Sequence, residues 1–403
     1  MRASFVLPVV LLVGCGLRVD VLTDSTDAAA FDGATDAGVV PEGGIADAPV
    51  MGSGAFVATG QYHSCAIITG TLLCWGDGRN GALGLGDTSN RIRPARVPLA
   101  RALLDVSLGE GFTCARTVEG EVWCFGANAR GELGVGDTNP RSTPTKLTLP
   151  RSAAQIAAGY EHACAILDDG ALVCWGENLE GQMGQNDSYP GANVLSPVRV
   201  GTDADWKSVS AGQGHVCGIR APGTLWCWGR NSDSELGQGA GAPIQIRTPT
   251  RVGDASDWVQ LDTGQNGACG VRADGSLWCW GGNAFGQAGT APSTAITAPR
   301  QVGADRDWLE VSIDTFSTCA RKRDGSLHCF GRNVEGALGV GDFTDRSSPT
   351  RAGTDLDWTQ VSMGRFHACA RKNTGAVACT GENVAGQLGV GDTNRRNVFT
   401  LVQ

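Results

Sequence analysis

The stretch CAILDDGALVCWG, residues 164–176, places Cys164 and Cys174 symmetrically about a turn that contains one glycine. If the two cysteines lie opposite each other in an antiparallel hairpin, the loop consists of Asp168, Asp169 and Gly170. Glycine then fills the last loop position, where a three-residue hairpin commonly needs a left-handed backbone. Variants of this phrase occur seven times along the chain, so the pattern predicts a repeated hairpin.

In the other copies, too, a short loop lies midway between the two cysteines. The first copy is one residue shorter and predicts a two-residue turn at Thr69 and Gly70. In every copy the cysteines occupy a non-hydrogen-bonded pair with Cα atoms about 4.5 Å apart, which is within reach of a disulfide. The remaining five copies each give a three-residue loop ending in glycine: residues 118–120, 221–223, 273–275, 323–325 and 373–375.

Fourteen of the fifteen cysteines therefore resolve into seven predicted disulfides, which an oxidising compartment would favour. Zinc is the alternative, but structural zinc sites usually bring C-x-x-C ligand pairs, and the sequence has none. Each short bridge contributes about 2–3 kcal/mol in the chain-entropy estimate. The predicted pairs are Cys65–Cys74, Cys114–Cys124, Cys164–Cys174, Cys217–Cys227, Cys269–Cys279, Cys319–Cys329 and Cys369–Cys379.

Residues 1–15, MRASFVLPVVLLVGC, combine one basic residue, Arg2, with an apolar run too short to span a bilayer as a permanent helix. This segment resembles a bacterial lipoprotein signal peptide, whose lipobox its last four residues match. The resemblance implies cleavage before Cys15 and acylation of its thiol. An ordinary secretory signal or a buried apolar segment is the alternative. Gly16 in place of aspartate resembles outer-membrane sorting, so we expect a lipid-anchored protein of the cell envelope, either periplasmic or surface-exposed.

Residues 16–53 carry seven acidic side chains against the single Arg18 and are otherwise mostly small or apolar. With a net charge of -6 and little large apolar surface, they are expected to form a disordered, self-repelling tether. Once that segment and Arg2 are set aside, the chain's net charge of -9 leaves -4 for residues 54–403. Mild acidity without a basic stripe argues against nucleic acid as a partner.

The repeat predicts the architecture of residues 54–403. The second cysteine of each pair recurs every 50 to 53 residues to the end of the chain, a period typical of solenoids and propellers. Each unit contains a short β segment such as VSAG, the cysteine hairpin, a glycine-rich turn and a closing segment such as SPTRAG. Four short strands per unit are typical of a propeller blade. We therefore expect an all-β, seven-bladed β-propeller.

The turns CWGDGRNGALGLGD, CFGANARGELGVGD, CFGRNVEGALGVGD and CTGENVAGQLGVGD resemble the repeat of the regulator of chromosome condensation family. Seven copies of that repeat form a seven-bladed propeller. Two copies depart from the pattern, with Ser234 in place of glycine and Ala288 in place of leucine or methionine. The chain starts this region at AFVATG and ends in NVFTLVQ. We expect these two ends to close the ring by completing one another, so that no blade is left with an open edge.

Histidine, aspartate and tryptophan recur at fixed positions of the repeat. Four histidines share one register, two residues before the first cysteine, which could suggest a metal site, but a turn-stabilising role is favoured: His63, His162, His215 and His367. The aspartates after the glycine-rich turns are expected to be hydrogen-bonded turn residues: Asp87, Asp137, Asp187, Asp342 and Asp392. Four tryptophans that follow an aspartate are expected to bury apolar area between blades: Trp206, Trp258, Trp308 and Trp358. His328 is expected to pack on its strand.

No nucleophile with an adjacent base, no H-E-x-x-H motif and no paired carboxylates stand out from the repeating framework. A sialidase-like propeller needs a buried arginine cluster and a tyrosine, and only three tyrosines are present. We therefore expect neither enzymatic activity nor a cofactor nor a metal.

Binding is the favoured function. Two positions between the VxxG segment and the histidine register vary most between copies, and equivalent loops of a propeller lie on one face. Ordinary loop drift is the alternative explanation. Some of these varying residues are of types enriched at interface hot spots, and we take them as candidate partner-binding residues: Tyr62, Tyr160, Phe316, Arg365 and Phe366.

Together these features predict a non-enzymatic scaffold that meets the membrane only through its lipid and binds a protein or glycan, and we expect a monomer. The family resemblance implies guanine-nucleotide exchange on a small GTPase, which an exported propeller would not meet, so exchange is disfavoured. Secreted propellers that inhibit β-lactamases make an enzyme inhibitor the first alternative. A glycan-binding or glycan-cleaving propeller is the second.

Overall fold

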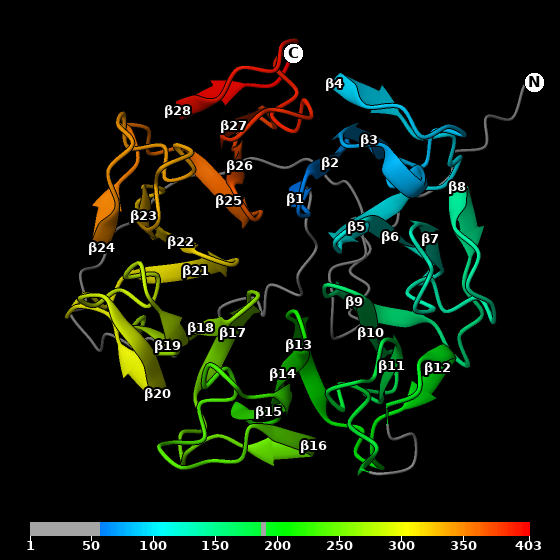
Figure 1. The fold of residues 1–403 in the computed structure, drawn as a ribbon, viewed down its shortest axis with the longest axis horizontal. Coiled ribbons are helices and arrows are strands. Elements are labelled where there is room, and N and C mark those ends of the chain that lie inside the picture. The colour runs from blue at the N-terminus through cyan, green and yellow to red at the C-terminus, as the bar shows by residue number, and fades with distance from the viewer. Residues whose placement is uncertain (1–56, 187–190) are drawn as a thin grey trace, which may run out of the picture. The chain divides into compact units, whose positions relative to one another are not determined.

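The computed structural model describes residues 57–186 and 191–403, which form a ring of seven four-stranded antiparallel sheets (Figure 1). Each sheet is built from four strands that are consecutive in the chain. Its first strand lies at the centre of the ring and its fourth strand at the rim (Figure 1). The predicted all-β, seven-bladed propeller is thereby confirmed.

The blades are numbered here in chain order. Blades 1 to 3 contain β1 (Val57–Thr59), β2 (His63–Ile68), β3 (Thr71–Gly76) and β4 (Arg91–Arg96); β5 (Leu103–Leu108), β6 (Phe112–Thr117), β7 (Val122–Gly126) and β8 (Arg141–Lys146); β9 (Ala153–Ala158), β10 (His162–Leu167), β11 (Leu172–Gly176) and β12 (Val194–Arg199). Blades 4 and 5 contain β13 (Trp206–Ala211), β14 (His215–Arg220), β15 (Thr224–Arg230) and β16 (Gln245–Arg251); β17 (Trp258–Thr263), β18 (Gly267–Arg272), β19 (Leu277–Asn283) and β20 (Ser293–Gln301). Blades 6 and 7 contain β21 (Trp308–Ile313), β22 (Ser317–Lys322), β23 (Leu327–Gly331) and β24 (Arg346–Arg351); β25 (Trp358–Met363), β26 (His367–Lys372), β27 (Val377–Gly381) and β28 (Arg396–Leu401). One short 3-10 turn, η1, spans Arg79–Gly81.

The second and third strands of each blade form the cysteine hairpin. In β10 and β11, Cys164 lies directly opposite Cys174, and the amide of Gly170 donates to the carbonyl of Leu167 to close the loop. Gly170 has a φ of 80°, the left-handed value that the loop was predicted to need. The structure joins the two cysteines of all seven pairs by disulfides, with Cα atoms 4.0–4.1 Å apart.

Two hairpin loops differ from the common three-residue form. The first is the predicted two-residue turn, in which Thr69 and Gly70 have φ values of 50° and 76°. The second is in blade 4, where Gly223 has a φ of 157° and the Ala221–Pro222 peptide is cis. Gly223 thus keeps a positive φ that L side chains rarely adopt, although it is far from the value of about 80° in the other three-residue loops, and Cys217 lies opposite Cys227.

The inner strand of each blade has an unpaired edge, and side chains of the preceding blade bind many of the N–H groups along it. The amide of Gln155 accepts from the N–H of Val209 at 3.1 Å and donates to the carbonyl of the same residue at 2.7 Å. The hydroxyl of Ser107 accepts from the N–H of Ala158 at 2.9 Å. These hydrogen bonds satisfy backbone groups that would otherwise remain unpaired at the centre of the ring.

The ring closes through the same interactions. Gln360 in blade 7 accepts from the N–H of Val57, and Ser362 accepts from the N–H of Thr59, each at 3.1 Å. The ends of the described chain thus close the ring as neighbouring blades, because β1 and β28 belong to different sheets. The expectation that they complete a single blade was wrong, since each blade already obtains four strands from one repeat.

Aromatic side chains fill the space between blades. Trp175 is fully buried, and its indole N–H donates to the backbone oxygen of Glu132 in the preceding blade at 2.8 Å. The tryptophans that follow an aspartate are at most 5% exposed, which confirms the burial predicted for them: Trp206, Trp258, Trp308 and Trp358. His328 packs edge-on against Trp308 at 5.5 Å between ring centroids, as predicted.

The glycine-rich turns are held by two polar residues. Asp137 accepts from the N–H of Asn139 and from Arg141, at 2.9 and 2.7 Å, and Asn128 accepts from the N–H of Leu133 across the turn. The predicted role of hydrogen-bonded turn residue is thus confirmed for Asp137 and for its equivalents Asp87, Asp342 and Asp392. Asp187 lies outside the described residues.

The two degenerate turns keep the fold by different means. Ser234 adopts a φ of 66°, the left-handed conformation that glycine has at this position in other blades. Ala288 is buried where other copies bury leucine or methionine.

The predicted signal peptide, Cys15 and the acidic tether lie outside the described residues. Among the described residues, no helix is long and apolar enough to cross a membrane.

We predict that replacing both Cys164 and Cys174 by alanine lowers the free energy of unfolding by about 2–3 kcal/mol, because the bridge restricts the unfolded chain. Urea denaturation of the oxidised protein and of the double variant would measure the change. A double variant as stable as the parent protein would contradict the prediction.

Candidate binding face

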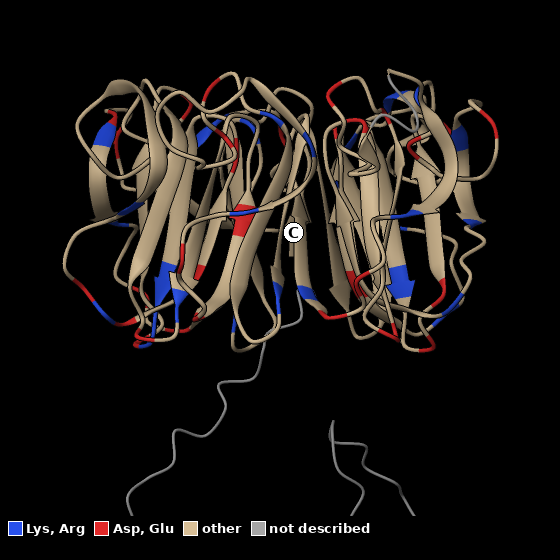
Figure 2. Ribbon diagram, turned by 90° about the horizontal axis from the view of Figure 1, so that it is seen from below, with Lys and Arg blue, Asp and Glu red and all other residues tan. Residues whose placement is uncertain are grey.

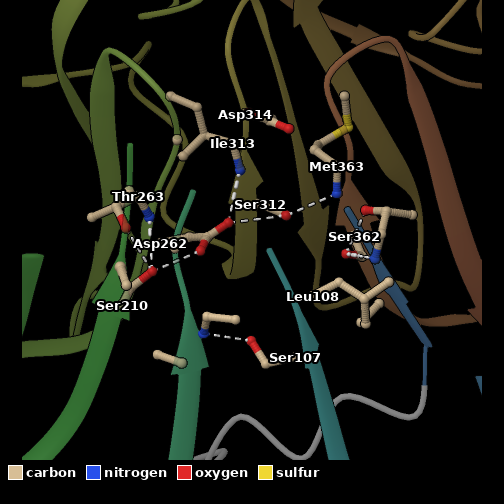
Figure 3. A pocket seen from close by; sticks show the side chains of 18 of the residues that line it. Ser107, Leu108, Ser210, Asp262, Thr263, Ser312, Ile313, Asp314, Ser362 and Met363 are labelled. Atoms are coloured by element: carbon tan, nitrogen blue, oxygen red, sulfur yellow. Dashed lines mark hydrogen bonds between the residues drawn. The ribbon is translucent and has the colours of Figure 1, made fainter. Parts of the chain in front are cut away.

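The inner strands of all seven blades line a central cavity of about 750 Å³. Hydroxyl, amide and carboxylate side chains alternate there with aliphatic ones such as Val209, Ile313 and Met363. Figure 3 shows that many of the polar groups are used within the wall: Ser312 accepts from the N–H of Met363 at 3.0 Å, and Ser210 from that of Thr263 at 3.0 Å. The cavity therefore has a polar wall whose hydrogen bonds hold the blades together.

One carboxylate replaces a hydroxyl in this wall. Asp262 occupies the position that is serine in four other blades, and it accepts from the N–H of Ile313 at 2.9 Å and from Ser210 and Ser312 at 3.0 Å (Figure 3). Burial outweighs these hydrogen bonds and raises the pKa of Asp262 from 3.8 to about 6.

A second carboxylate occurs where six blades have glycine. At Gly364, a Cβ atom would lie 2.5 Å from the His367 ring. Blade 6 has Ser317 in place of that histidine, which removes the ring and makes room for Asp314. Burial raises the pKa of Asp314 to about 7. Asp314 and Asp262 thus place two buried carboxylates in one sector of the cavity.

The histidine register is buried between blades. Nε2 of His63 lies 3.0 Å from the Thr113 hydroxyl, and Nε2 of His367 lies 2.9 Å from the Ser64 hydroxyl, in each case in the next blade around the ring. Burial lowers the pKa of all four register histidines, to about 4 for His63 and about 3 for the others. They are neutral packing groups at physiological pH. Within residues 57–186 and 191–403, no cluster of histidine, cysteine, aspartate or glutamate could hold a metal.

The loops that follow the inner strands lie at one end of the blades, together with the glycine-rich turns, because alternate connections of an antiparallel sheet share an end. We call this end the turn face. Acidic and basic residues are mixed on both ends of the ring (Figure 2). All five candidate partner-binding residues lie in the loops of the turn face, and each is half-buried: Tyr62, Tyr160, Phe316, Arg365 and Phe366.

Four rings from four successive blades form a continuous strip on the turn face. Phe285 meets Phe316 edge-on at 5.3 Å between centroids, Phe316 stacks on Phe366 at 6.0 Å, and Phe366 lies 6.5 Å from Tyr62. We call Phe285, Phe316, Phe366 and Tyr62 the aromatic strip. It brings together three of the candidates that are distant in sequence.

Guanidinium groups cover the aromatic strip. Arg332 Cζ lies 5.3–5.6 Å from the centroids of the three phenylalanines, and Arg365 Cζ lies 5.0 Å from that of Phe366. These distances are typical of cation–π contacts. Arg79 lies 6.0 Å from the Tyr62 centroid at the far end of the strip.

Arg365 also connects the strip to Tyr160. The Gln61 amide contacts Arg365 and the Tyr160 hydroxyl, and its nitrogen donates to Glu110 at 2.9 Å. Burial and the hydrogen bond with Glu110 raise the pKa of Tyr160 to about 12. All five candidates therefore lie in one connected group, although their role in binding stays a prediction.

Sequence reasoning missed Phe285, Arg332 and Arg79, because the candidates were taken from only one of the two loop sets on the turn face. A signal was present for Phe285, since the equivalent position of the glycine-rich turn is polar or small in every other copy. The contact of Arg332 with three rings of three blades had no signal in the sequence.

The geometry defines a seven-bladed β-propeller with an aromatic and arginine-rich face over a central cavity. Two sequence models of the regulator of chromosome condensation (RCC1) repeat match it, one over residues 69–116, 119–166, 169–219 and 324–371, the other over 104–132, 153–182, 206–235, 258–287 and 358–387. Together they match more than half of the chain. The protein belongs to the RCC1 repeat family.

Two sequence relatives match a quarter of the chain. The X-linked retinitis pigmentosa GTPase regulator homolog of Caenorhabditis elegans is 34% identical over 99 residues, which is 24% of this chain and 7% of the relative. The protein RCC2 homolog of Xenopus laevis is 31% identical over 108 residues, which is 26% of this chain and 21% of the relative. The match thus spans less than a quarter of either relative.

Two solved structures share the fold. Human WBSCR16 superposes with a TM-score of 0.75 at 21% identity, covering 83% of this chain and 94% of that one. Prp20p of Saccharomyces cerevisiae, described with its binding properties to Gsp1p and histones, gives a TM-score of 0.74 at 21% identity, covering 86% and 87%. At such identity the likeness shows the fold alone.

We predict that Asp262→Ser changes the free energy of unfolding relative to the parent protein, and that this change favours the variant more at pH 7 than at pH 4. The pKa of Asp262 is higher in the folded than in the unfolded state, so the folded state binds more protons and loses stability as the pH rises from about 4 to about 6. Serine can keep the hydrogen bond with the N–H of Ile313 without this penalty. The relative gain should be about 2–3 kcal/mol.

Urea denaturation of both proteins at pH 4, 5, 6 and 7 would measure the effect. A stability difference that does not change with pH would show that Asp262 keeps an ordinary pKa.

Proposed function

We propose that this protein is a non-enzymatic binding scaffold, lipid-anchored at the cell envelope, that engages a protein partner through the turn face. The aromatic strip carries this proposal: four rings from blades 5, 6, 7 and 1 form a continuous surface with arginines stacked on them. Half-buried aromatic and arginine side chains at the centre of a face are the types that dominate protein–protein binding energy.

A protein fits this surface better than a glycan does. Sugars bind to open ring faces, whereas Arg332 and Arg365 lie over the phenylalanines of the strip. Next to the strip, a groove of about 780 Å³ lined by Gln61, Glu110 and Arg79 offers space for partner side chains. A surface that combines an apolar strip with a polar groove suits a folded protein with mixed side chains.

The proposed location rests on two features. Seven disulfides, one in each blade, fit an oxidising compartment. The lipobox-like LVGC at residues 12–15 supports an exported bacterial lipoprotein. Two of the similar proteins are named for a GTPase or for binding Gsp1p and histones, but guanine-nucleotide exchange is not proposed, because an exported propeller would not meet a cytosolic GTPase. An enzyme inhibitor would use the same turn face, and the identity of the partner separates the two functions.

We predict that p-benzoylphenylalanine introduced at Tyr62 or Phe366 crosslinks one protein partner in intact cells, and that the same probe at Val118 does not. Val118 is 55% exposed and lies in a hairpin loop at the opposite end of the blades. The purified partner should bind Phe366→Ala at least 10-fold more weakly than the parent protein, as expected for a hot-spot aromatic, and Val118→Ala within about 2-fold.

If Phe366→Ala and Val118→Ala lost the same affinity for the partner, or if only the probe at Val118 crosslinked, binding through the turn face would be contradicted. Retention of the parent protein on envelope polysaccharide without any protein partner would favour the glycan alternative.

We predict that Cys15→Ser releases the protein from the membrane fraction. The parent protein should carry acyl groups on Cys15 as its first residue, because more than one acyl chain is needed for stable anchoring at a bilayer. Mass spectrometry of the N-terminal peptide and fractionation of both proteins would test this. An unmodified, uncleaved N-terminus in the parent protein would contradict the lipoprotein assignment.

A further inference from the structure

The outer strands of six blades share two features at their exposed edge. Each carries a proline and, two residues later, a long polar side chain: Pro94 and Arg96, Pro144 and Lys146, Pro197 and Arg199, Pro249 and Arg251, Pro299 and Gln301, Pro349 and Arg351. Prolines and charged side chains on edge strands prevent pairing with another chain. Six of the seven rim edges are therefore protected.

The direction of the backbone shows how the proline works. The N–H of Val97, just after β4, donates inward to the carbonyl of Leu72 on β3. Pro94 lies inside the register shift of β4 between Arg91 and Ala95, at the outer edge of the sheet. Proline is tolerated at such a bulge of an edge strand and leaves no N–H there for a further strand.

Blade 7 lacks both features. Phe399 occupies the proline position of β28, and Leu401 occupies the position of the polar residue. The N–H of Val402 donates inward to Val377, so the N–H of Leu401 points away from the blade. Thr400 pairs with Cys379, and Phe399 precedes it inside the register shift of β28 between Arg396 and Thr400, at the outer edge of the sheet. Leu401 is 55% exposed, and neighbouring Val398 is 49% exposed. In Figure 1, β28 lies at the rim and forms the outer edge of its sheet.

We infer that β28 pairs in antiparallel fashion with β28 of a second copy of this chain, about a two-fold axis at Thr400. In this register Phe399 faces Leu401 of the other copy in both directions, and the two residues exchange backbone hydrogen bonds. Thr400 faces its own equivalent, and Val398 faces Val402. Such cross-strand pairs of aromatic, aliphatic and β-branched side chains stabilise antiparallel sheets.

Self-complementarity is the reason to expect a second copy. Each residue from Val398 to Val402 meets a partner of its own kind when the strand is turned about Thr400, as a two-fold interface requires. Arg395 and Arg396 lie beyond the paired segment and do not face each other. The same register on β24 would oppose Pro349 to Arg351, with a missing donor and an unsatisfied charge.

The ring of Phe399 leaves the edge accessible, because it packs inward at 5.3 Å from the Trp358 centroid. One strand pair buries less surface than a permanent dimer requires, so the association is reversible. This inference replaces the monomer expected from the sequence, and it does not depend on the proposed binding function of the turn face.

Cysteine at the two-fold axis tests the pairing directly. Thr400 and its equivalent would form a non-hydrogen-bonded pair with Cα atoms about 4.5 Å apart, similar to the native cystine pairs at 4.0–4.1 Å. Thr400→Cys should therefore form a disulfide between two chains, found by mass spectrometry as a peptide linking residue 400 to itself. Thr350→Cys on β24 is the matched control, because it has the same register beside Pro349 and Arg351.

Sedimentation velocity tests the association without an added cysteine. The mass of the parent protein should rise from one chain toward two between about 10 µM and 1 mM, the range expected for an interface of this size. Leu401→Arg restores the long polar side chain that the other six blades have at this position, and the variant should stay at the mass of one chain, with an unchanged circular dichroism spectrum. The inference is overturned if the parent protein stays monomeric, if Leu401→Arg associates equally, or if Thr400→Cys crosslinks no more than Thr350→Cys.

Discussion

The register of the central hairpin is the constraint on which the rest of each blade depends. A slip of one residue would move every side chain to the opposite face of its sheet. Facing cysteines are joined at the same non-hydrogen-bonded position in all seven hairpins, and all fourteen are at most 1% exposed. With that register held, each blade presents buried aromatic side chains to a neighbour, its inner edge to the cavity and its outer edge to the rim.

Each blade has two edge strands with unpaired backbone groups. The chain satisfies these groups at the centre of the ring and discourages their pairing with another chain at the rim. At the centre, side chains such as Gln155 and Ser107 bind the backbone of the next inner strand. At the rim, proline and arginine or lysine discourage pairing. The departures from each rule are informative: Asp262 changes the charge of the cavity wall, and Phe399 leaves one rim edge open.

Much of the fold follows from the sequence because its determinants are local. The hairpin loops, the cysteine pairs and the turn aspartates involve residues that are close in the chain, and the repeat period sets the number of blades. Contacts between blades were harder to predict. The ring closure by Gln360 and Ser362, and the convergence of Arg332 on three phenylalanines, depend on residues from different repeats whose approach only the folded ring reveals. The five candidate residues came from variation within one loop set, and they are only part of the connected group that the structure places on the turn face.

The disulfide within each hairpin and the proposed location outside the reducing cytosol can be tested together. The most direct test is peptide mapping by mass spectrometry of the unreduced protein isolated from its own cells. We expect seven linked peptides, each joining the two cysteines of one hairpin, from Cys65–Cys74 to Cys369–Cys379. Free thiols at these positions, or sulfurs joined between different blades, would contradict it.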